Sequence, residues 1–290
     1  MTPNRETPTP LPKLGIIAGS GALPARLASA ALAAGREVFI VGLEGFADSA
    51  ALTPFPHAFA RIGAAGQIRD LLHSHSCQDL VLIGGVRRPS IFELRPDAEG
   101  AKILARIGRA AFAGDDGLLA AIVRVLGEEG FRVLGAQDVL REVQAPAGLL
   151  TTIAPDAQAL ADIARGVAVA RALGAADVGQ GCVVQQGLVL AVEAIEGTDA
   201  MLARCAPLAR SGPGGVLIKL AKPGQERRAD LPTIGAATVA AAAAAGLRGI
   251  AYEAGGTLLA DRAAALALAE DTGLFVIGLD LNTFANGDPA

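Results

Sequence analysis

The stretch KLGIIAGSGALPARLASAALAAGREVFIVGL, residues 13–43, decides the fold of the first half of the chain. A short apolar run leads into a glycine turn, then alanines and leucines recur at helical spacing, and a second apolar run follows. This order predicts strand, turn, helix and strand. Strands are also predicted within 57–62, 79–86 and 131–140, with helical segments between them. The alternation predicts a doubly wound, mainly parallel Rossmann-like α/β domain over residues 13–140.

The second half of the chain mixes hairpins with helices. Residues 141–155 carry two prolines and no clear period, which predicts a linker. Beyond the linker, CVVQQGLVLAVEAIEG (182–197) predicts a hairpin that turns at Gln186-Gly187, and GIAYEAGGTLLAD (249–261) predicts another. We therefore expect a mixed-sheet α/β catalytic domain over residues 156–284. The proline-rich leader, residues 1–12, is expected to be disordered.

The composition limits the class of protein. The chain has 290 residues and is 52% hydrophobic but only 3% aromatic, so its core must be aliphatic. A net charge of -4 argues against a nucleic-acid partner. Three cysteines without a CxxC pair indicate a reducing compartment and no zinc ribbon. The longest apolar run is shorter than the ~20 residues that span a bilayer, so we expect a cytoplasmic protein.

The first candidate ligand site is the loop Gly19-Ser20-Gly21, after the first strand. Glycine lets a backbone approach a phosphate closely, and the N-terminus of the following helix adds N–H donors. A dinucleotide fingerprint would have a third glycine where Pro24 stands. A plain strand-to-helix turn accounts for the same residues equally well.

Two other loops of the first half carry charge. Gly85, Arg87 and Arg88 lie beyond the carboxyl end of a buried strand, where doubly wound sheets bind ligands. The arginines suit an anion, although a solvated loop is nearly as plausible. Asp115 and Asp116 precede a helix, and one aspartate suffices as its N-cap. The other carboxylate is then available to a hydroxyl or a metal.

The segment EAIEGTD, residues 193–199, holds three acids between a strand and a helix. Thr198 or Asp199 can simply cap that helix. The turn at Gly197 can also bring Glu196 and Asp199 together.

The segment KLAKPGQERRAD, residues 219–230, is half charged in a chain with 19% charged residues overall. Lys219 alternates with apolar residues at the end of a strand, which favours a side chain that points into a pocket. Asp230 precedes Leu231-Pro232, where we expect a helix to begin. Lysines that hold phosphate oxygens, with a carboxylate for Mg²⁺ or for water, are what phosphoryl chemistry requires. The alternative is a solvated loop with self-neutralising charges.

Five motifs in this order resemble one known family. They are LGIIAGSGALP, GDD, DVGQG, GLVLAVEAIEGTDAML and KPGQERRADLPTIG. Together they are similar to the LpxI-type UDP-2,3-diacylglucosamine pyrophosphatases of lipid A biosynthesis, and the likeness covers roughly residues 13–282.

The resemblance implies a reaction and a setting for it. It implies Mg²⁺-dependent hydrolysis of UDP-2,3-diacylglucosamine to UMP and 2,3-diacylglucosamine 1-phosphate (lipid X), with water attacking the phosphorus nearer the sugar. It also implies two domains that hold the substrate, a homodimer, and peripheral contact with the cytoplasmic face of the inner membrane through the lipid substrate.

The resemblance also implies roles for individual residues. Asp230, in the DLPTIG motif, is implied as the catalytic residue and as a metal ligand together with Glu196 and Asp199. The residues implied to bind substrate are Gly19, Ser20, Gly21, Gly85, Asp116, Gln180, Thr198, Lys219, Lys222, Gln225 and Thr233. The resemblance assigns no role to Arg87, Arg88, Arg227 and Arg228.

Two alternatives remain open. The first is a nicotinamide-dependent oxidoreductase with a dinucleotide domain in the first half, against which Pro24 and the lack of an obvious proton donor weigh. The second is a non-catalytic module that binds a nucleotide or a lipid. Such a module would bind its ligand without turnover, whether or not Asp230 is present.

Overall fold

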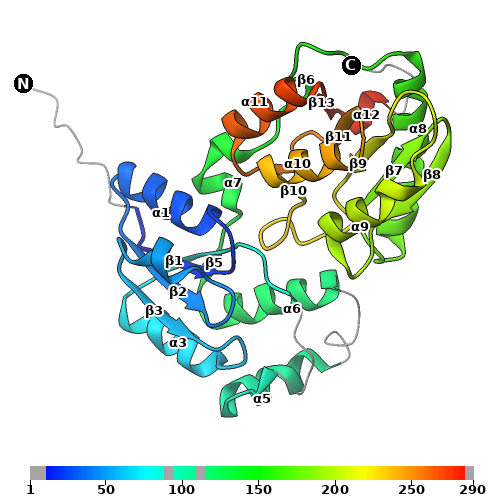
Figure 1. The fold of residues 1–290 in the computed structure, drawn as a ribbon. Coiled ribbons are helices and arrows are strands. Elements are labelled where there is room, and N and C mark those ends of the chain that lie inside the picture. The colour runs from blue at the N-terminus through cyan, green and yellow to red at the C-terminus, as the bar shows by residue number, and fades with distance from the viewer. Residues whose placement is uncertain (1–10, 88–93, 109–114, 285–290) are drawn as a thin grey trace, which may run out of the picture. The chain divides into compact units, whose positions relative to one another are not determined.

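A computed structural model of the chain describes residues 11–87, 94–108 and 115–284, except for the side chains of Asp115 and Asp116. These residues form two compact units (Figure 1). The first unit includes the described residues up to 108 and 118–140, and the second includes 115–117 and 141–284. Each unit has its own sheet.

The sheet of the first unit has five parallel strands in the order β3-β2-β1-β4-β5. Their bounds are β1 Leu14–Ala18, β2 Val38–Leu43, β3 His57–Ala60, β4 Asp79–Ile83 and β5 Arg132–Val133. Residues of β1, β2 and β4 are almost all buried, so both faces of the sheet are covered. This confirms the doubly wound arrangement predicted for the first half.

The helices of the first unit lie between successive strands, except α7, which follows β5. They are α1 Leu23–Ala33, α2 Ser49–Leu52, α3 Ala65–Ser74, α5 Ala98–Ile107, α6 Asp115–Glu128 and α7 Ala136–Val139. The prediction of a strand through residue 140 is wrong beyond β5. The backbone N–H of Gly135 donates to the carboxylate of Asp138 at 2.9 Å, and this local bond favours the helical turn α7.

The second unit contains a six-stranded mixed sheet in the order β6-β13-β11-β9-β7-β8. Its strands are β6 Gly148–Leu149, β7 Gly181–Gln185, β8 Leu188–Val192, β9 Val216–Lys219, β11 Gly249–Glu253 and β13 Phe275–Leu279. The central β13, β11 and β9 are parallel, and β6, β7 and β8 add antiparallel pairs. The β7–β8 hairpin turns at Gln186 and Gly187, with φ of 54° and 77°, as predicted.

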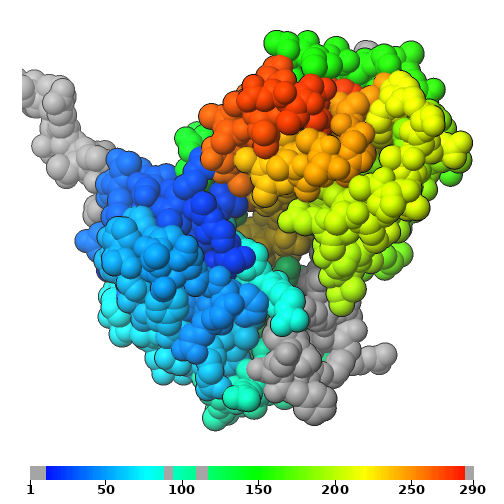
Figure 2. All heavy atoms as spheres, viewed as in Figure 1, coloured from blue at the N-terminus to red at the C-terminus, as the bar shows by residue number. Residues whose placement is uncertain are grey.

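Helices cover both faces of this mixed sheet. They are α8 Ala157–Ala175, α9 Gly197–Cys205, α10 Ala236–Ala244, α11 Arg262–Thr272 and α12 Leu281–Phe284, with 3₁₀ turns at Arg141–Val143 and Ala206–Leu208. Residues of α8 pack into one core with the sheet, and residues of α9, α10 and α11 pack into another. Figure 2 shows α10 and α11, in orange and red, with adjoining surfaces. The mixed sheet predicted for the second half is therefore confirmed.

Two predictions in the second half are wrong. Residues 249–261 do not form a hairpin, because β11 joins the large sheet whereas β12, Leu258–Leu259, pairs in parallel with β10, Thr233–Ile234. The alanine-rich helix begins at Ala236 and not at Pro232, because the short strand β10 precedes it.

Among the helices that the structure describes, we find none with the length and apolar character needed to cross a membrane.

Candidate functional site

Lys219 is the centre of a polar cluster in the second unit. It ends β9, and only 4% of the residue is exposed. Its Nζ donates to Thr198 Oγ1 at 2.8 Å and to the carbonyl oxygen of Thr233 at 3.3 Å. Thr198 lies in the first turn of α9, and Thr233 begins β10. Three predicted site residues from distant parts of the sequence therefore meet at one amine.

Nearby carboxylates partly offset the burial of this amine. Burial holds the pKa of Lys219 below its usual value, although Glu193, Asp199 and Asp230 each raise it. A protonated lysine has three N–H donors, and two are directed to the oxygens of Thr198 and Thr233. The third donor can bind an anionic ligand.

Asp230 is held by a second set of bonds. Gln225 is buried, and its Nε2 donates to Asp230 Oδ2 at 2.7 Å and to Gln180 Oε1 at 3.4 Å. The backbone N–H of Lys222 donates to Gln225 Oε1 at 2.9 Å, and Lys222 Nζ donates to Asp177 Oδ1 at 2.6 Å. The structure thus connects the predicted site residues Gln180, Lys222, Gln225 and Asp230 in one hydrogen-bonded group.

The two arginines of the charged loop form ion pairs. Arg227 pairs with Glu253 at 2.8 Å, and the other oxygen of that carboxylate accepts from the backbone N–H of Ala221 at 3.0 Å. Arg228 pairs with Glu226 at 2.7 Å and holds the pKa of the Glu226 carboxyl below its usual value. Both arginines are thus engaged in ion pairs, whereas the lysines lie at the site.

Asp230 does not begin a helix, contrary to the sequence prediction. The N-cap of α10 is Gly235, and β10 lies between the two. The backbone N–H of Asp230 instead closes a turn on the carbonyl oxygen of Glu226 at 3.0 Å. Its carboxylate is therefore positioned by Gln225 and not by a helix terminus.

The predicted capping residues of α9 do not cap it either. The N-cap position is taken by Glu196, and no side chain bonds the free N–H groups there. Glu196 pairs with Arg204 at 2.6 Å, which lowers the pKa of its carboxyl.

A metal ion at this site would need oxygen ligands from a bound ligand as well as from the protein. Among the described residues, no three or more His, Cys, Asp or Glu side chains are grouped so as to hold a metal by themselves. Asp199 and Asp230 both act on the charge of Lys219. Mg²⁺ is usually held by one or two carboxylates together with substrate phosphates. The donor set suits that arrangement and not an all-protein metal site.

In the first unit, the loops after β1 and β4 are bonded together. Ser20 and Gly85 exchange two backbone hydrogen bonds, at 2.9 and 3.1 Å, and Ser20 Oγ also donates to Gly85 O at 2.9 Å. A Cβ atom on Gly19 would lie 2.6 Å from Gly85 O, so glycine is needed there for close packing. Gly21 has φ of 91° and faces open space. These loops lie where the strand order reverses, the usual ligand position of a doubly wound sheet.

Of the charged residues that the sequence singles out in the first half, Arg88 and the side chain of Asp116 lie outside the described residues. Arg87 is exposed.

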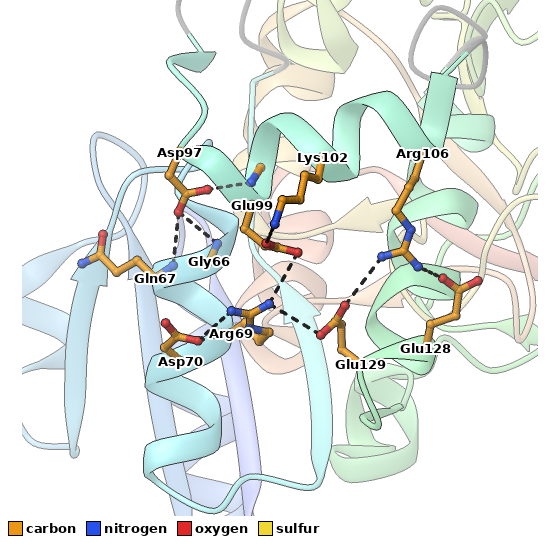
Figure 3. Close-up of polar contacts among 11 residues, drawn as sticks. Gly66, Gln67, Arg69, Asp70, Asp97, Glu99, Lys102, Arg106, Glu128 and Glu129 are labelled. Carbon is orange, nitrogen blue, oxygen red and sulfur yellow. Dashed lines mark hydrogen bonds and ion pairs between the residues drawn. The ribbon is translucent and has the colours of Figure 1, made fainter.

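A separate polar cluster, in the first unit, joins α3, α5 and the end of α6 (Figure 3). Arg69 of α3 pairs with Glu99 of α5 at 3.5 Å and with Glu129, just after α6, at 3.8 Å. Arg106 of α5 pairs with Glu128 and Glu129. A shallow groove runs along α3 and the start of α5, but its charged side chains are bonded to other groups of these helices. This cluster stabilises the unit and is not a candidate site.

The sequence prediction did not select two residues of the site. Glu193 accepts a hydrogen bond from Thr198 Oγ1 at 2.9 Å, and Asp177 binds Lys222. Asp177 begins the DVGQG motif, residues 177–181, which was noted in the sequence without a role for its acid. Glu193 was noted only as one of three acids in its segment.

The fold and the site define a class: a two-unit α/β protein with a doubly wound unit, followed by a mixed-sheet unit that carries a buried lysine among carboxylates. The LpxI N-terminal domain model matches residues 13–143, and the LpxI C-terminal domain model matches residues 146–277. The chain is also similar to the UDP-2,3-diacylglucosamine pyrophosphatase LpxI of Caulobacter vibrioides, with 48% identity over 274 residues, covering 92% of this chain and 98% of the relative. The chain belongs to the LpxI family, which confirms the resemblance seen in its motifs.

Proposed function

We propose that the protein is an enzyme of lipid A biosynthesis that hydrolyses the pyrophosphate of UDP-2,3-diacylglucosamine, with Mg²⁺, to UMP and 2,3-diacylglucosamine 1-phosphate. The observation that carries the proposal is its 48% identity to a relative named UDP-2,3-diacylglucosamine pyrophosphatase, over nearly the whole length of both chains. The site supports the proposal independently, because the aspartate that Gln225 holds lies near enough to the buried Lys219 to act on the charge of the lysine.

The lysines bind and neutralise the phosphates in this proposal. Lys219 directs its remaining N–H donor to a non-bridging oxygen, and Lys222, held by Asp177, contributes a second positive charge. Phosphoryl transfer depends mainly on positioning and on charge stabilisation. A donor that the fold already holds in place needs no reorganisation during the reaction.

Asp230 orients the attacking water and, together with Asp199, would hold the metal. Bound Mg²⁺ would supply further charge neutralisation on the phosphate oxygens. The oxygen of water forms a bond to the phosphorus nearer the sugar, and the anhydride bond between that phosphorus and the bridging oxygen breaks. UMP leaves with the bridging oxygen, the former water oxygen remains on the sugar phosphate, and the protons of the water pass to the product phosphates or to solvent.

The remaining predicted features belong to the same proposal. Gly19, Ser20, Gly21 and Gly85 would contact the nucleotide side of the substrate, and the acyl chains would occupy an aliphatic surface. The protein would act in the cytoplasm as a homodimer and would touch the inner membrane through its lipid substrate.

The first test is UMP release by the purified chain from UDP-2,3-diacylglucosamine. We expect turnover with Mg²⁺, loss of turnover when EDTA is added, and recovery when Mg²⁺ is restored, because the metal neutralises the leaving and attacked phosphates. NAD and ADP-ribose serve as controls with a pyrophosphate but no acylated sugar. Equal rates on these dinucleotides would contradict the substrate assignment, and tight binding without turnover would indicate a binding module.

A further inference from the structure

Glu193 is a buried acid whose position is unusual. It directly follows β8, it is 7% exposed, and its backbone N–H donates to Gly181 O at 2.8 Å. One carboxylate oxygen, Oε1, accepts from Thr198 Oγ1. Within the described part of the chain, the other oxygen, Oε2, has no hydrogen-bond partner. An incompletely bonded buried acid costs free energy of folding, so a role beyond stability should explain it.

The beginning of β7 is shaped around this acid. A Cβ atom on Gly181 would lie 2.6 Å from Glu193 Oε2, and one on Gly179 would lie 2.1 Å from the Glu193 carbonyl oxygen. Any other residue at these two positions would displace the acid. The glycines of the DVGQG motif therefore make room for Glu193, while Gln180 between them contacts the group that holds Asp230.

The Thr198 hydroxyl connects Glu193 to Lys219. A hydroxyl has one proton, and here that proton is directed to Glu193 because Thr198 Oγ1 accepts from the lysine on its other side. The carboxylate thus fixes the rotation of the hydroxyl, and the hydroxyl fixes the direction of the lysine amine.

We propose that Glu193 is a positioning residue for the reaction: acting through Thr198, it holds the ammonium group of Lys219 in the place from which the lysine binds a phosphate oxygen. This inference rests on the proposed function. It assigns to Glu193 no contact with the substrate.

The test compares Glu193→Gln with the wild type. Glutamine has the same shape, but its amide group can donate to Thr198 and turn the hydroxyl proton toward the lysine. Because small misplacements of a positioned group cost about 10²-fold in rate, we expect kcat to fall by about that factor with KM within about threefold of wild type. A purely structural role would lower the melting temperature and leave kcat per folded molecule unchanged.

Two substitutions of Thr198 test the connection without altering the acid. Thr198→Ser keeps the hydroxyl and should lose less kcat than Thr198→Val, which keeps the shape but removes the hydroxyl and should lose as much kcat as Glu193→Gln. The double variant that combines Glu193→Gln with Thr198→Val should be no slower than either single variant. Each of the two substitutions already breaks the connection from Glu193 through Thr198 to Lys219, so the second has nothing further to break.

Asp162→Asn is the matched control. Asp162 is also a buried acid of the second unit, but it binds the backbone N–H groups of Gln186 and Gly187 at the other end of β7. This control should lower the melting temperature without lowering kcat. Wild-type kcat in Glu193→Gln, or equal kcat in the two Thr198 variants, would overturn the inference alone. An inactive wild type would overturn the proposed function and the inference with it.

Discussion

Asp230 illustrates what a single side chain needs in order to act on a phosphate. Its carboxylate accepts a hydrogen bond from Gln225, which is itself fixed by the backbone of Lys222. The sequence predicted the importance of this residue through the DLPTIG motif, but it predicted the wrong support. Gln225 is five positions away along an irregular loop, and no periodicity indicates which side chains such a loop brings together.

We expect Asp230→Asn to lower kcat by about 10²–10⁴-fold, the range typical of a lost acid–base or orienting group. Asparagine keeps the shape and can still accept from Gln225, so the free energy of unfolding should change by no more than about 1 kcal/mol. UMP release and thermal melting of the same preparation measure the two effects.

Glu226→Gln is the matched control for Asp230→Asn. Glu226 lies in the same loop, but it pairs with the exposed Arg228, and such surface pairs contribute little. The Glu226→Gln variant should keep the kcat and the melting temperature of the wild type. Near-native turnover in Asp230→Asn would show that Asp230 is not catalytic.

At the scale of helices and strands, the sequence predicted the elements best where the pattern of apolar residues extended over many positions. The alternation over residues 13–43 gave β1, α1 and β2, and the Gln186-Gly187 pair gave the β7–β8 hairpin. The sequence did not predict β10 and β12. These strands have two residues each, and they pair in parallel although a helix and a strand lie between them in the chain. Strands of that length show no period, and their pairing depends on long-range packing.

Asp97 is an example of a residue that joins two helices. As the N-cap of α5, its Oδ1 accepts from Gly100 N at 2.6 Å, and its Oδ2 accepts from Gly66 N and Gln67 N, at 3.0 and 3.3 Å, at the start of α3 (Figure 3). Partial burial opposes ionisation, but the three backbone donors outweigh it, and the pKa of Asp97 lies below its usual value.

We expect Asp97→Ala to lower the free energy of unfolding by about 1–2 kcal/mol at neutral pH, because it removes caps from two helices. A carboxyl whose pKa is depressed in the folded state stabilises the protein above its unfolded pKa of about 3.9, and the effect disappears as pH falls through the folded pKa. The difference between wild type and variant should therefore shrink on acidification.

Urea unfolding at several pH values measures this difference. Asp70→Ala is the control, since Asp70 also lies on α3 but, among the described residues, forms only an exposed pair with Arg69. A constant difference between wild type and Asp97→Ala down to a pH of about 2 would contradict the capping role.

At the scale of the whole molecule, the two units have separate sheets and separate cores. In the first unit, Leu80 lies fully buried in β4, an interior strand of the sheet. In the second unit, Leu274 lies just before β13, 1% exposed, within the core that α9, α10 and α11 share. Units with their own cores commonly unfold as separate cooperative transitions.

We therefore expect two transitions in calorimetry, each sensitive to one matched substitution. Leu80→Ala should destabilise the first unit and Leu274→Ala the second, because each leaves a cavity that costs about 2–5 kcal/mol. For units of this size, such a loss lowers one transition by roughly 10 °C or more, while the other transition should stay in place. The wild type supplies the reference, and the retained transition in each variant serves as an internal control. A single transition that both substitutions lower equally would show instead that the two units unfold as one, and the division of the chain would then describe its architecture but not its stability.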